Sequence, residues 1–370
     1  MGTRLIGVIT FMKKIQVFRM IAFLLVVALL VSGLTAVALM QPDFSQTAQR
    51  YDDFKDLEEN TVDVIFTGTS GIDRYWIAPK AFEEYGMTAY NLSSDAQPTW
   101  LVKNVLEEAT KTQSPKLVVI DTRAFTTKYG KQIGNIEIGA RYLTDGDCFS
   151  FKNRIDAIER TLVALKTIKP EKDFDRKTFY LPLIKHHGAW ANIQDFVDEY
   201  SYSVMGYYMC SIRTPVTTKE IEDFSYETTQ VGEMHPIAQG YLYELLDYLD
   251  TKDYEVLFLN TPQGRSEGEM RTVNAVTQVL ESRGYKHLVC YVDETYDKSK
   301  DFYNQGHVNF HGAEKFTDFF AQYLKDNYDL EDHRDDERCQ QWYGHYDEIK
   351  ATVAQWEAEI EAEKEAKAKK

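Results

Sequence analysis

The sequence predicts an α/β protein with a doubly wound parallel sheet, preceded by an N-terminal transmembrane helix. Three observations support this prediction: short apolar runs bounded by turn residues, helical patterns between those runs, and an uncharged stretch near the N-terminus. The runs are apolar on both faces, which is typical of strands in a parallel sheet that helices cover. Their alternation with helical patterns indicates βαβ units.

The first expected element is the uncharged stretch 21–40. At about 1.5 Å per residue it spans roughly the 30 Å hydrocarbon core of a bilayer. A basic leader over 1–20 comes before it and acidic residues follow it, so we expect the N-terminus to stay in the cytoplasm. We therefore predict a single-pass membrane protein whose C-terminal domain is extracytoplasmic. A start at Met12 and signal-peptidase cleavage after Ala38 remain alternatives.

The remaining elements follow in chain order over a predicted domain at 41–345. Residues 41–60 are expected to form a polar stalk or a first helix. Strands are expected at 62–68, 88–93, 116–122, 254–261 and 287–293, and helices at 100–112, 151–168, 238–251, 268–284 and 312–328. The alternation is interrupted over about 123–236, which we interpret as a helical insertion that caps the sheet. The tail 346–370 is predicted to be a charged, solvated helix without assigned function.

Charge and cysteine spacing argue against several kinds of partner. The chain has 42 Lys and Arg against 58 Asp and Glu, a net charge of −16, and no basic stripe. We therefore expect no nucleic acid partner. The four cysteines are Cys148, Cys210, Cys290 and Cys339, and no pair has metal-site spacing, so we expect no metal site. Cys290 lies in an apolar strand pattern and is interpreted as a buried thiol, so we expect no obligatory disulfide. We also expect no cofactor.

A serine follows the first predicted strand, in the turn Gly68-Thr69-Ser70-Gly71. Ligands of doubly wound sheets bind outside the carboxyl ends of the strands, where helix N-termini favour anions. Ser70 at this edge is a candidate nucleophile, and the Gly71 N–H a candidate oxyanion donor. The motif differs from the Gly-x-Ser-x-Gly elbow of α/β-hydrolases. Small residues are also common in plain β–α turns, so the motif alone leaves both interpretations open.

A histidine in the last loop strengthens the interpretation as a nucleophile. His307 comes just before the last helix of the predicted sheet domain and therefore on the same side of the sheet. A serine nucleophile needs a base, and a histidine base needs a third group that holds its tautomer. Asn304 stands three residues before His307, and Asp301 stands six before.

On these motifs the chain resembles the SGNH (GDSL-type) hydrolase and acyltransferase superfamily. It is most similar to the membrane-anchored bacterial branch that includes the D-alanyl transfer protein of teichoic acid synthesis. The family's Gly-x-Ser turn matches Gly68–Ser70, and its Asp-x-x-His motif matches Asn304–His307. The resemblance covers roughly 60–125 and 250–330 and implies a flavodoxin-like sandwich. It also implies oxyanion or substrate contacts from a second block at 85–98, with candidates Asn91, Ser93 and Ser94.

The chain departs from the family pattern at two places. Asn304 replaces the family's aspartate, so an amide would orient His307 and a weaker base is expected. Asp301 would supply the missing charge if the loop folds back. The family's third block, Gly-x-Asn-Asp, is absent, and Arg123 stands there as an oxyanion donor, an anion-binding group or a partner in a surface ion pair. These departures leave a catalytically silent relative open.

Two residues of the insertion are further candidates. His187 and Trp190 would line a sugar-binding wall, because an indole face packs well on a pyranose. An ordinary half-buried aromatic cluster is the alternative interpretation.

The resemblance implies an extracytoplasmic serine acyltransferase or esterase for ester-linked acyl groups of cell-envelope polysaccharide or teichoic acid. It also implies a membrane-bound O-acyltransferase as partner. Transfer to a polymer hydroxyl and hydrolysis by water use the same residues, so the sequence does not separate them. The alternative from another class is a non-catalytic glycan-binding or assembly protein of an envelope acylation system.

Overall fold

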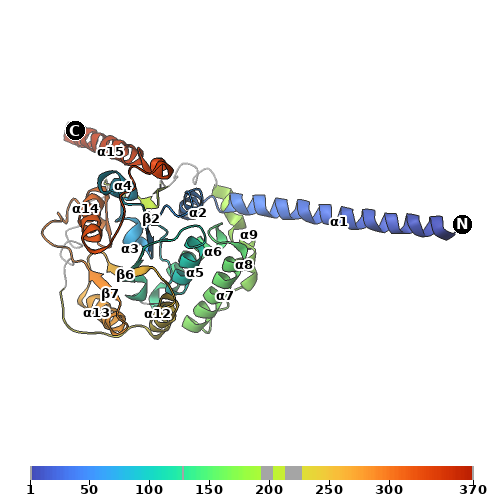
Figure 1. Cartoon of the computed structure of the whole chain (residues 1–370), viewed down its shortest axis with the longest axis horizontal. Coiled ribbons are helices and arrows are strands. Elements are labelled where there is room, and N and C mark those ends of the chain that lie inside the picture. The colour runs from blue at the N-terminus through green and yellow to red at the C-terminus, as the bar shows by residue number, and fades with distance from the viewer. Residues whose placement is uncertain (1, 127–128, 193–202, 213–226, 369–370) are drawn as a thin grey trace. The chain divides into compact units, whose positions relative to one another are not determined.

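The structure is a computed structural model that describes residues 2–126, 129–192, 203–212 and 227–368 (Figure 1). The side chains of 2–13, 42–43, 130–131 and 190–192 lie outside this description. The chain divides into two compact units. One is Met1–Ser45 with Asp175–Tyr200, and the other is Gln46–Phe174 with Ser201–Lys370.

The first unit is built on a long apolar helix, α1 (Gly2–Ala38). Its part Lys14–Ala38 is long and apolar enough to cross a membrane, a property that membrane anchors share with signal sequences. The described part of this unit also contains three short helical segments, of which the last two contact α1: α8 (Arg176–Tyr180), α9 (Pro182–His186) and η3 (His187–Asn192). The apolar span predicted at 21–40 thus lies almost wholly within one continuous helix that ends at Ala38.

The second unit contains a five-stranded, fully parallel sheet with the order β2-β1-β3-β6-β7. The strands are β1 (Val64–Thr67), β2 (Ala89–Asn91), β3 (Leu117–Asp121), β6 (Glu255–Asn260) and β7 (Lys286–Val289). All five lie where the apolar runs predict them, so a mixed α/β fold with a parallel sheet is confirmed. β7 is shorter than predicted, because the chain leaves the sheet after the Cys290 N–H donates to the Asn260 carbonyl at 2.8 Å.

Helices cover this sheet on both faces (Figure 1). Phe66 of β1 packs against Trp76 and Phe320, with ring centroids 5.0 and 6.0 Å away, so the helix that carries Phe320 covers one face. That helix, α14 (Phe310–Asn327), contacts α4 (Ala78–Tyr85). On the other face α5 (Val102–Ala109) contacts β1 and packs with α12 (Pro236–Leu249).

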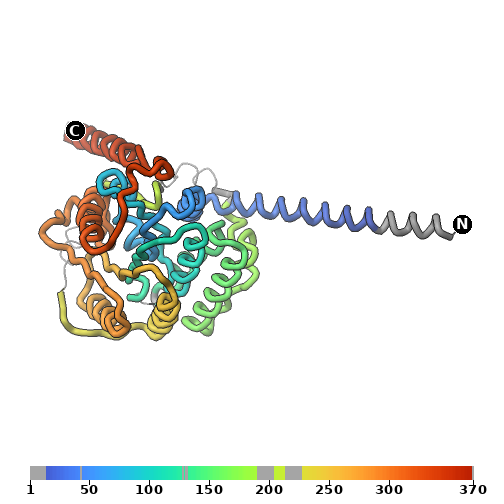
Figure 2. Tube along the Cα trace, in the orientation of Figure 1, coloured from blue at the N-terminus to red at the C-terminus, as the bar shows by residue number. Residues whose placement is uncertain are grey.

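The remaining described elements of this unit can be followed in Figure 2. They are α2 (Pro42–Lys55), which begins in the first unit, α3 (Ser70–Asp73), η1 (Thr99–Leu101), η2 (Thr122–Thr126), α6 (Tyr129–Asp145), α7 (Phe151–Ile168), α13 (Glu267–Ser282), η4 (Glu337–Trp342) and α15 (His345–Ala368). Two small antiparallel hairpins are β4 (Ser203–Val204) with β5 (Tyr207–Tyr208), and β8 (Phe302–Asn304) with β9 (His307–Val308).

The predicted insertion and tail differ from expectation in how they pack. Within 123–236, α6 packs on α7 and α7 packs on α5, so this part belongs to the sheet unit, whereas α8 and α9 belong to the first unit. The tail helix α15 buries Tyr346, Ile349 and Val353, which repeat at helical spacing, and its first turns contact α4. Its start is therefore packed, and the description of a solvated tail holds only beyond it.

Candidate active site

Ser70 and His307 meet at the carboxyl edge of the sheet although 237 positions separate them in the sequence. The Ser70 Oγ lies 2.9 Å from the His307 Nε2, and the His307 Nδ1 lies 2.9 Å from the Asn304 Oδ1. Of the two predicted candidates for the third group, Asn304 is the one that contacts the imidazole. The three residues form a Ser-His-Asn chain of hydrogen bonds.

The neighbours of Asn304 determine where the protons of this chain lie. The Gly306 N–H donates to the Asn304 Oδ1 at 2.9 Å, so the atom facing the imidazole must be the amide oxygen and not the nitrogen. His307 Nδ1 then carries a proton and donates it to the same oxygen. The Nε2 is left as an acceptor for the Ser70 hydroxyl, which is the tautomer that a serine–histidine pair requires.

The turn after β1 positions Ser70 through one carboxylate of β3. The N–H and the hydroxyl of Thr69 both donate to the Asp121 Oδ2, at 3.1 and 2.5 Å. Gly68 has a φ of +151°, and a Cβ there would lie 2.4 Å from the Asp121 Cβ, so only glycine fits this approach. Ser70 is therefore held at the first position of α3, with 9% of its surface exposed.

His307 is placed by the β8–β9 hairpin, which the sequence analysis treated as a loop. Asn309 follows it and caps α14, since its Oδ1 accepts from the His311 and Gly312 N–H groups. Asp301 does not fold back onto the histidine. Its Oδ2 accepts instead from the Lys315 Nζ at 2.6 Å and from the Asp297 N–H at 2.7 Å, and these two donors account for the different position.

Arg123 lies beside the same imidazole. Its N–H donates to the Asp121 Oδ1 at 3.0 Å, and its Nη1 donates to the Gly306 carbonyl at 3.0 Å and lies 3.3 Å from the His307 Nε2. Arg123 is half-buried and contacts backbone and imidazole at the site, and these contacts favour the two site roles over a surface ion pair. A guanidinium here is a charged donor next to the serine.

The surroundings of His307 favour its neutral form. Burial, and then the positive charges of Arg123 and Arg74, hold the pKa of His307 well below its usual range. The imidazole is therefore uncharged at neutral pH and able to accept a proton. Asn304 supplies no negative charge to stabilise the imidazolium, so His307 is a weaker base than one paired with a carboxylate.

The predicted backbone oxyanion donors are all engaged within the protein. The Gly71 N–H donates to the Thr69 Oγ1 at 3.1 Å, and the Ser94 N–H donates to the Gly68 carbonyl at 3.1 Å. The Ser93 N–H donates to the Asn91 Oδ1 at 2.9 Å. The block at 91–94 thus supports the turn that carries Ser70. Arg123, which itself donates to the Gly306 carbonyl, is the predicted donor that lines the cavity beside Ser70.

A cavity of about 180 Å³ opens beside Ser70 and Arg123. Its other walls include Gln97, from the predicted block at 85–98, and the α6 residues Tyr129, Gln132, Asn135 and Ile136, which were not predicted. Gln97 is buried, and its Oε1 has no hydrogen-bond partner among the described residues. A larger cavity of about 870 Å³ lies at the opposite, amino edge of the sheet, far from this chemistry.

Arg265 is a further group that sequence reasoning missed. It follows β6 at the same edge of the sheet and is buried, and its Nε and Nη2 have no hydrogen-bond partner in the described part of the chain. Burial and the nearby Arg123 lower the pKa of Arg265 to about 10. A buried guanidinium with unpaired N–H groups is well suited to bind an anion. No motif surrounds it in the sequence that would have indicated this role.

Buried ion pairs lie behind the serine. Asp73 of α3 is 3.4 Å from the Arg50 Nη2, and Arg50 also donates to the Ser93 carbonyl. Burial raises the pKa of Asp73 to about 6 despite this partner. The pair ties α2 to the short helix that begins with Ser70.

The two candidates in the insertion belong to the other unit. His187 is exposed in η3, where its Nδ1 lies 3.0 Å from the Ile184 carbonyl. The side chain of Trp190 lies outside the described residues. The sugar-binding wall therefore stays a prediction.

No family model matches the chain, and no curated protein matches it either. The resemblance to SGNH proteins consequently rests on the motifs themselves.

Proposed function

We propose that the chain is a membrane-anchored serine acyltransferase or esterase that acts outside the cytoplasm. Its substrates would be ester-linked acyl groups of a cell-envelope polysaccharide or teichoic acid. The observation that carries the proposal is the 2.9 Å contact between the Ser70 Oγ and the His307 Nε2, with the Nδ1 held by the Asn304 Oδ1. A nucleophile, a base and an orienting group stand in the order that acyl transfer needs.

The proposed reaction has two steps. The Ser70 Oγ attacks the carbonyl carbon of an acyl donor while its proton moves to the His307 Nε2. The leaving group departs with that proton and an acyl-enzyme remains. In the second step His307 takes the proton of a polymer hydroxyl or of water, whose oxygen attacks the acyl-enzyme, and then returns the proton to Ser70.

Arg123 would stabilise the negative charge that develops on the carbonyl oxygen. It lines the same cavity as Ser70, and it lies 3.3 Å from the histidine that faces the serine. It would thus replace the asparagine of the family's third block. The loss of one such donor typically lowers the rate by about 10²–10³.

The topology is consistent with a doubly wound SGNH sandwich. In the order β2-β1-β3-β6-β7 the chain moves outward in opposite directions from the β1–β3 pair. Ligands bind at such a switch point, outside the carboxyl ends of the strands. Ser70 follows β1 and Arg123 follows β3, so both would border that crevice.

The polymer and the partner come from the resemblance. Membrane-anchored members of the branch work in surface-polymer acylation, which favours transfer over hydrolysis and implies a membrane-bound O-acyltransferase partner. The apolar helix α1 supports the location. The unpaired N–H groups of Arg265 are consistent with a substrate that carries negative charge.

A non-catalytic binding protein is the second candidate. The low pKa of His307 and the engaged N–H groups of Gly71, Ser93 and Ser94 favour it over an efficient enzyme. In that case the cavity beside Ser70 would hold an acylated ligand without turning it over.

Labelling with a fluorophosphonate serine probe distinguishes the two candidates. The full-length protein in detergent is incubated with the probe, and its intact mass is measured for the wild type, Ser70→Ala and His307→Ala. The matched control is Ser282→Ala, an exposed serine at the end of α13. We expect one adduct that both site variants lose and the control keeps. A folded wild type without adduct would refute catalysis by this pair and leave the binding role.

A further inference from the structure

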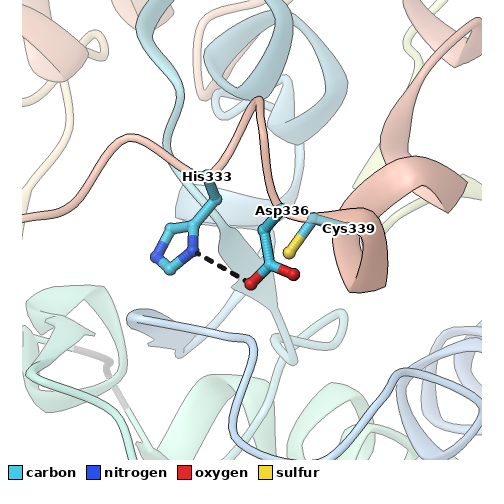
Figure 3. A group of neighbouring side chains, drawn as sticks. All are labelled: His333, Asp336 and Cys339. Atoms are coloured by element: carbon cyan, nitrogen blue, oxygen red, sulfur yellow. Dashed lines mark ion pairs between the residues drawn. The ribbon is translucent and has the colours of Figure 1, made fainter.

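Three side chains with metal-binding atoms converge near the amino edge of the sheet, two in the segment before η4 and one within η4. His333, Asp336 and Cys339 point toward one another, and their ligand atoms all lie within 4.8 Å of one another (Figure 3). They recur at intervals of three residues. None of them contributes to the serine–histidine site.

The histidine of this cluster is oriented by a fourth residue. Asp63, just before β1, accepts from the His333 Nε2 at 3.0 Å, so the Nε2 carries the proton. The Nδ1 is left with a free lone pair and lies 4.0 Å from the Asp336 Oδ2. A carboxylate that holds the remote nitrogen of an imidazole is the usual outer partner of a metal-binding histidine.

We propose that the His333 Nδ1, the Asp336 carboxylate and the Cys339 Sγ bind a zinc ion. A set of nitrogen, oxygen and sulfur ligands suits Zn²⁺, whereas Ca²⁺ and Mg²⁺ take oxygen ligands. Tetrahedral bonds of about 2.0–2.3 Å separate neighbouring ligand atoms by roughly 3.3–3.7 Å. The 4.0 Å between the His333 Nδ1 and the Asp336 Oδ2 therefore needs to shorten by about 0.5 Å, and the pairs with Cys339, which lie within 4.8 Å, by up to about 1 Å.

Charge and access around the cluster are compatible with a bound cation. Cys339 is fully buried, and burial raises the pKa of its thiol to about 11, so the ion would displace a proton when it binds the sulfur. Asp63 and Asp336 add two negative charges. The Lys116 Nζ lies 3.5 Å from the Asp63 Oδ2, and the Arg338 Nη2 donates to the Asp336 Oδ2 at 2.7 Å, so the ion would take the place of Arg338 at that oxygen. The Asp336 side chain is 24% exposed, which leaves room for water as the fourth ligand.

The position of the cluster indicates a structural role. The same segment docks on α4 and β2: the His333 N–H donates to the Gly86 carbonyl at 2.9 Å, and Trp342 packs on Phe82 and Tyr90. Figure 2 shows this C-terminal segment in red beside α4. A zinc ion held by these three residues would fix the fold of the segment 333–339, and the hydrogen bond from His333 to Asp63 would link that segment to the amino edge of the sheet.

Metal binding by the full-length protein tests this proposal. The protein in detergent is treated with a chelator, desalted, titrated with ZnCl₂ and desalted again, and bound zinc is measured by elemental mass spectrometry. We expect one zinc per chain in the wild type and in the control Cys148→Ser, which removes a buried thiol elsewhere. Cys339→Ser and His333→Ala should lose it. Asp63→Asn should bind zinc about 10–100-fold more weakly, because it removes only the outer partner.

Cobalt gives a second readout. Co²⁺ in place of Zn²⁺ should produce a thiolate-to-cobalt absorption band that Cys148→Ser keeps and Cys339→Ser loses. If Cys339→Ser does not fold, Asp336→Asn at the partly exposed ligand provides the zinc comparison. Equal zinc in the wild type and in the folded ligand variants would overturn the proposal, as would no zinc in the wild type. Serine labelling should be unchanged after chelation.

Discussion

Asn304→Asp tests how the charge state of His307 is set. The substitution keeps the size and shape of the side chain. In the wild type the His307 Nδ1 and the Gly306 N–H both lie 2.9 Å from the Asn304 Oδ1. An oxygen of the introduced carboxylate would still accept from these two groups. The geometry should therefore persist, and the change is one added negative charge beside the imidazole.

The expected size of the effect follows from that distance. An opposite charge within about 4–6 Å shifts a pKa by about 1–3 units, which corresponds to about 1.4–4 kcal/mol. In the wild type, burial and then Arg123 and Arg74 hold the pKa of His307 well below its usual range. The new carboxylate opposes all three, so we expect this pKa to rise by about 1–3 units.

The pH dependence of fluorophosphonate labelling measures this shift. Only neutral His307 can accept the proton of Ser70, so the second-order rate constant should rise as the pH rises through the pKa of His307 and then level off. In the wild type the pH at which the rate constant rises should lie well below the ordinary histidine pKa of about 6.5. In Asn304→Asp the rise of the rate constant should move to higher pH. The rate constant at its plateau should be roughly tenfold higher, because a stronger base removes the proton more readily.

Gln305→Glu is the matched control, since it adds the same charge to the same hairpin turn. Gln305 has no hydrogen bond to His307 within the described residues. In Gln305→Glu the pH at which the labelling rate rises should shift much less than in Asn304→Asp. No shift in Asn304→Asp, or equal shifts in the two variants, would refute the inference that Asn304 orients His307 and limits its basicity.

Two further predictions concern stability. Because the folded pKa of Asp73, about 6, lies above the unfolded value of about 3.8, the wild type should gain up to about 3 kcal/mol relative to Asp73→Asn as the pH falls from 7 to 4. Denaturant unfolding of both proteins at several pH values measures this difference, and a constant gap would contradict it. Gly68→Ala should cost about 2–3 kcal/mol and most of the serine labelling, because the new Cβ meets Asp121 at a positive φ. Gly134→Ala is the control, because its new Cβ meets open space in α6 and should cost no stability. Thermal melts measure both variants, and an equal loss of stability in the two would argue against strain at the turn.

The strands and the pairing of Ser70 with His307 could be predicted because their signals are local. Apolar runs mark the five strands, and in a parallel sheet the carboxyl ends of the strands meet at one edge. Part of the cavity wall comes from α6, whose sequence carries no signal of which sheet edge it will cover. Likewise, His333 meets Asp63 across 270 positions, and no spacing rule predicts such a contact.

The predictions for Asp301 and for the tail were wrong for other reasons. The spacing allowed Asp301 to contact His307, but it did not show that the Asp301 carboxylate would accept a hydrogen bond from Lys315, one helical turn and a half into α14. In the tail, Tyr346, Ile349 and Val353 do form an apolar stripe. The surrounding charge of α15 masked it in the sequence.

The separation of the serine from its base has a consequence for synthesis of the chain. A polypeptide grows from its N-terminus, so Ser70 is made 237 residues before His307. At about 5–20 residues per second this interval lasts roughly 10–50 s, and during it the serine has no general base. Any fragment that ends before β8 carries the same inert hydroxyl. The proposed acyl-transfer chemistry thus begins only after His307 has been made.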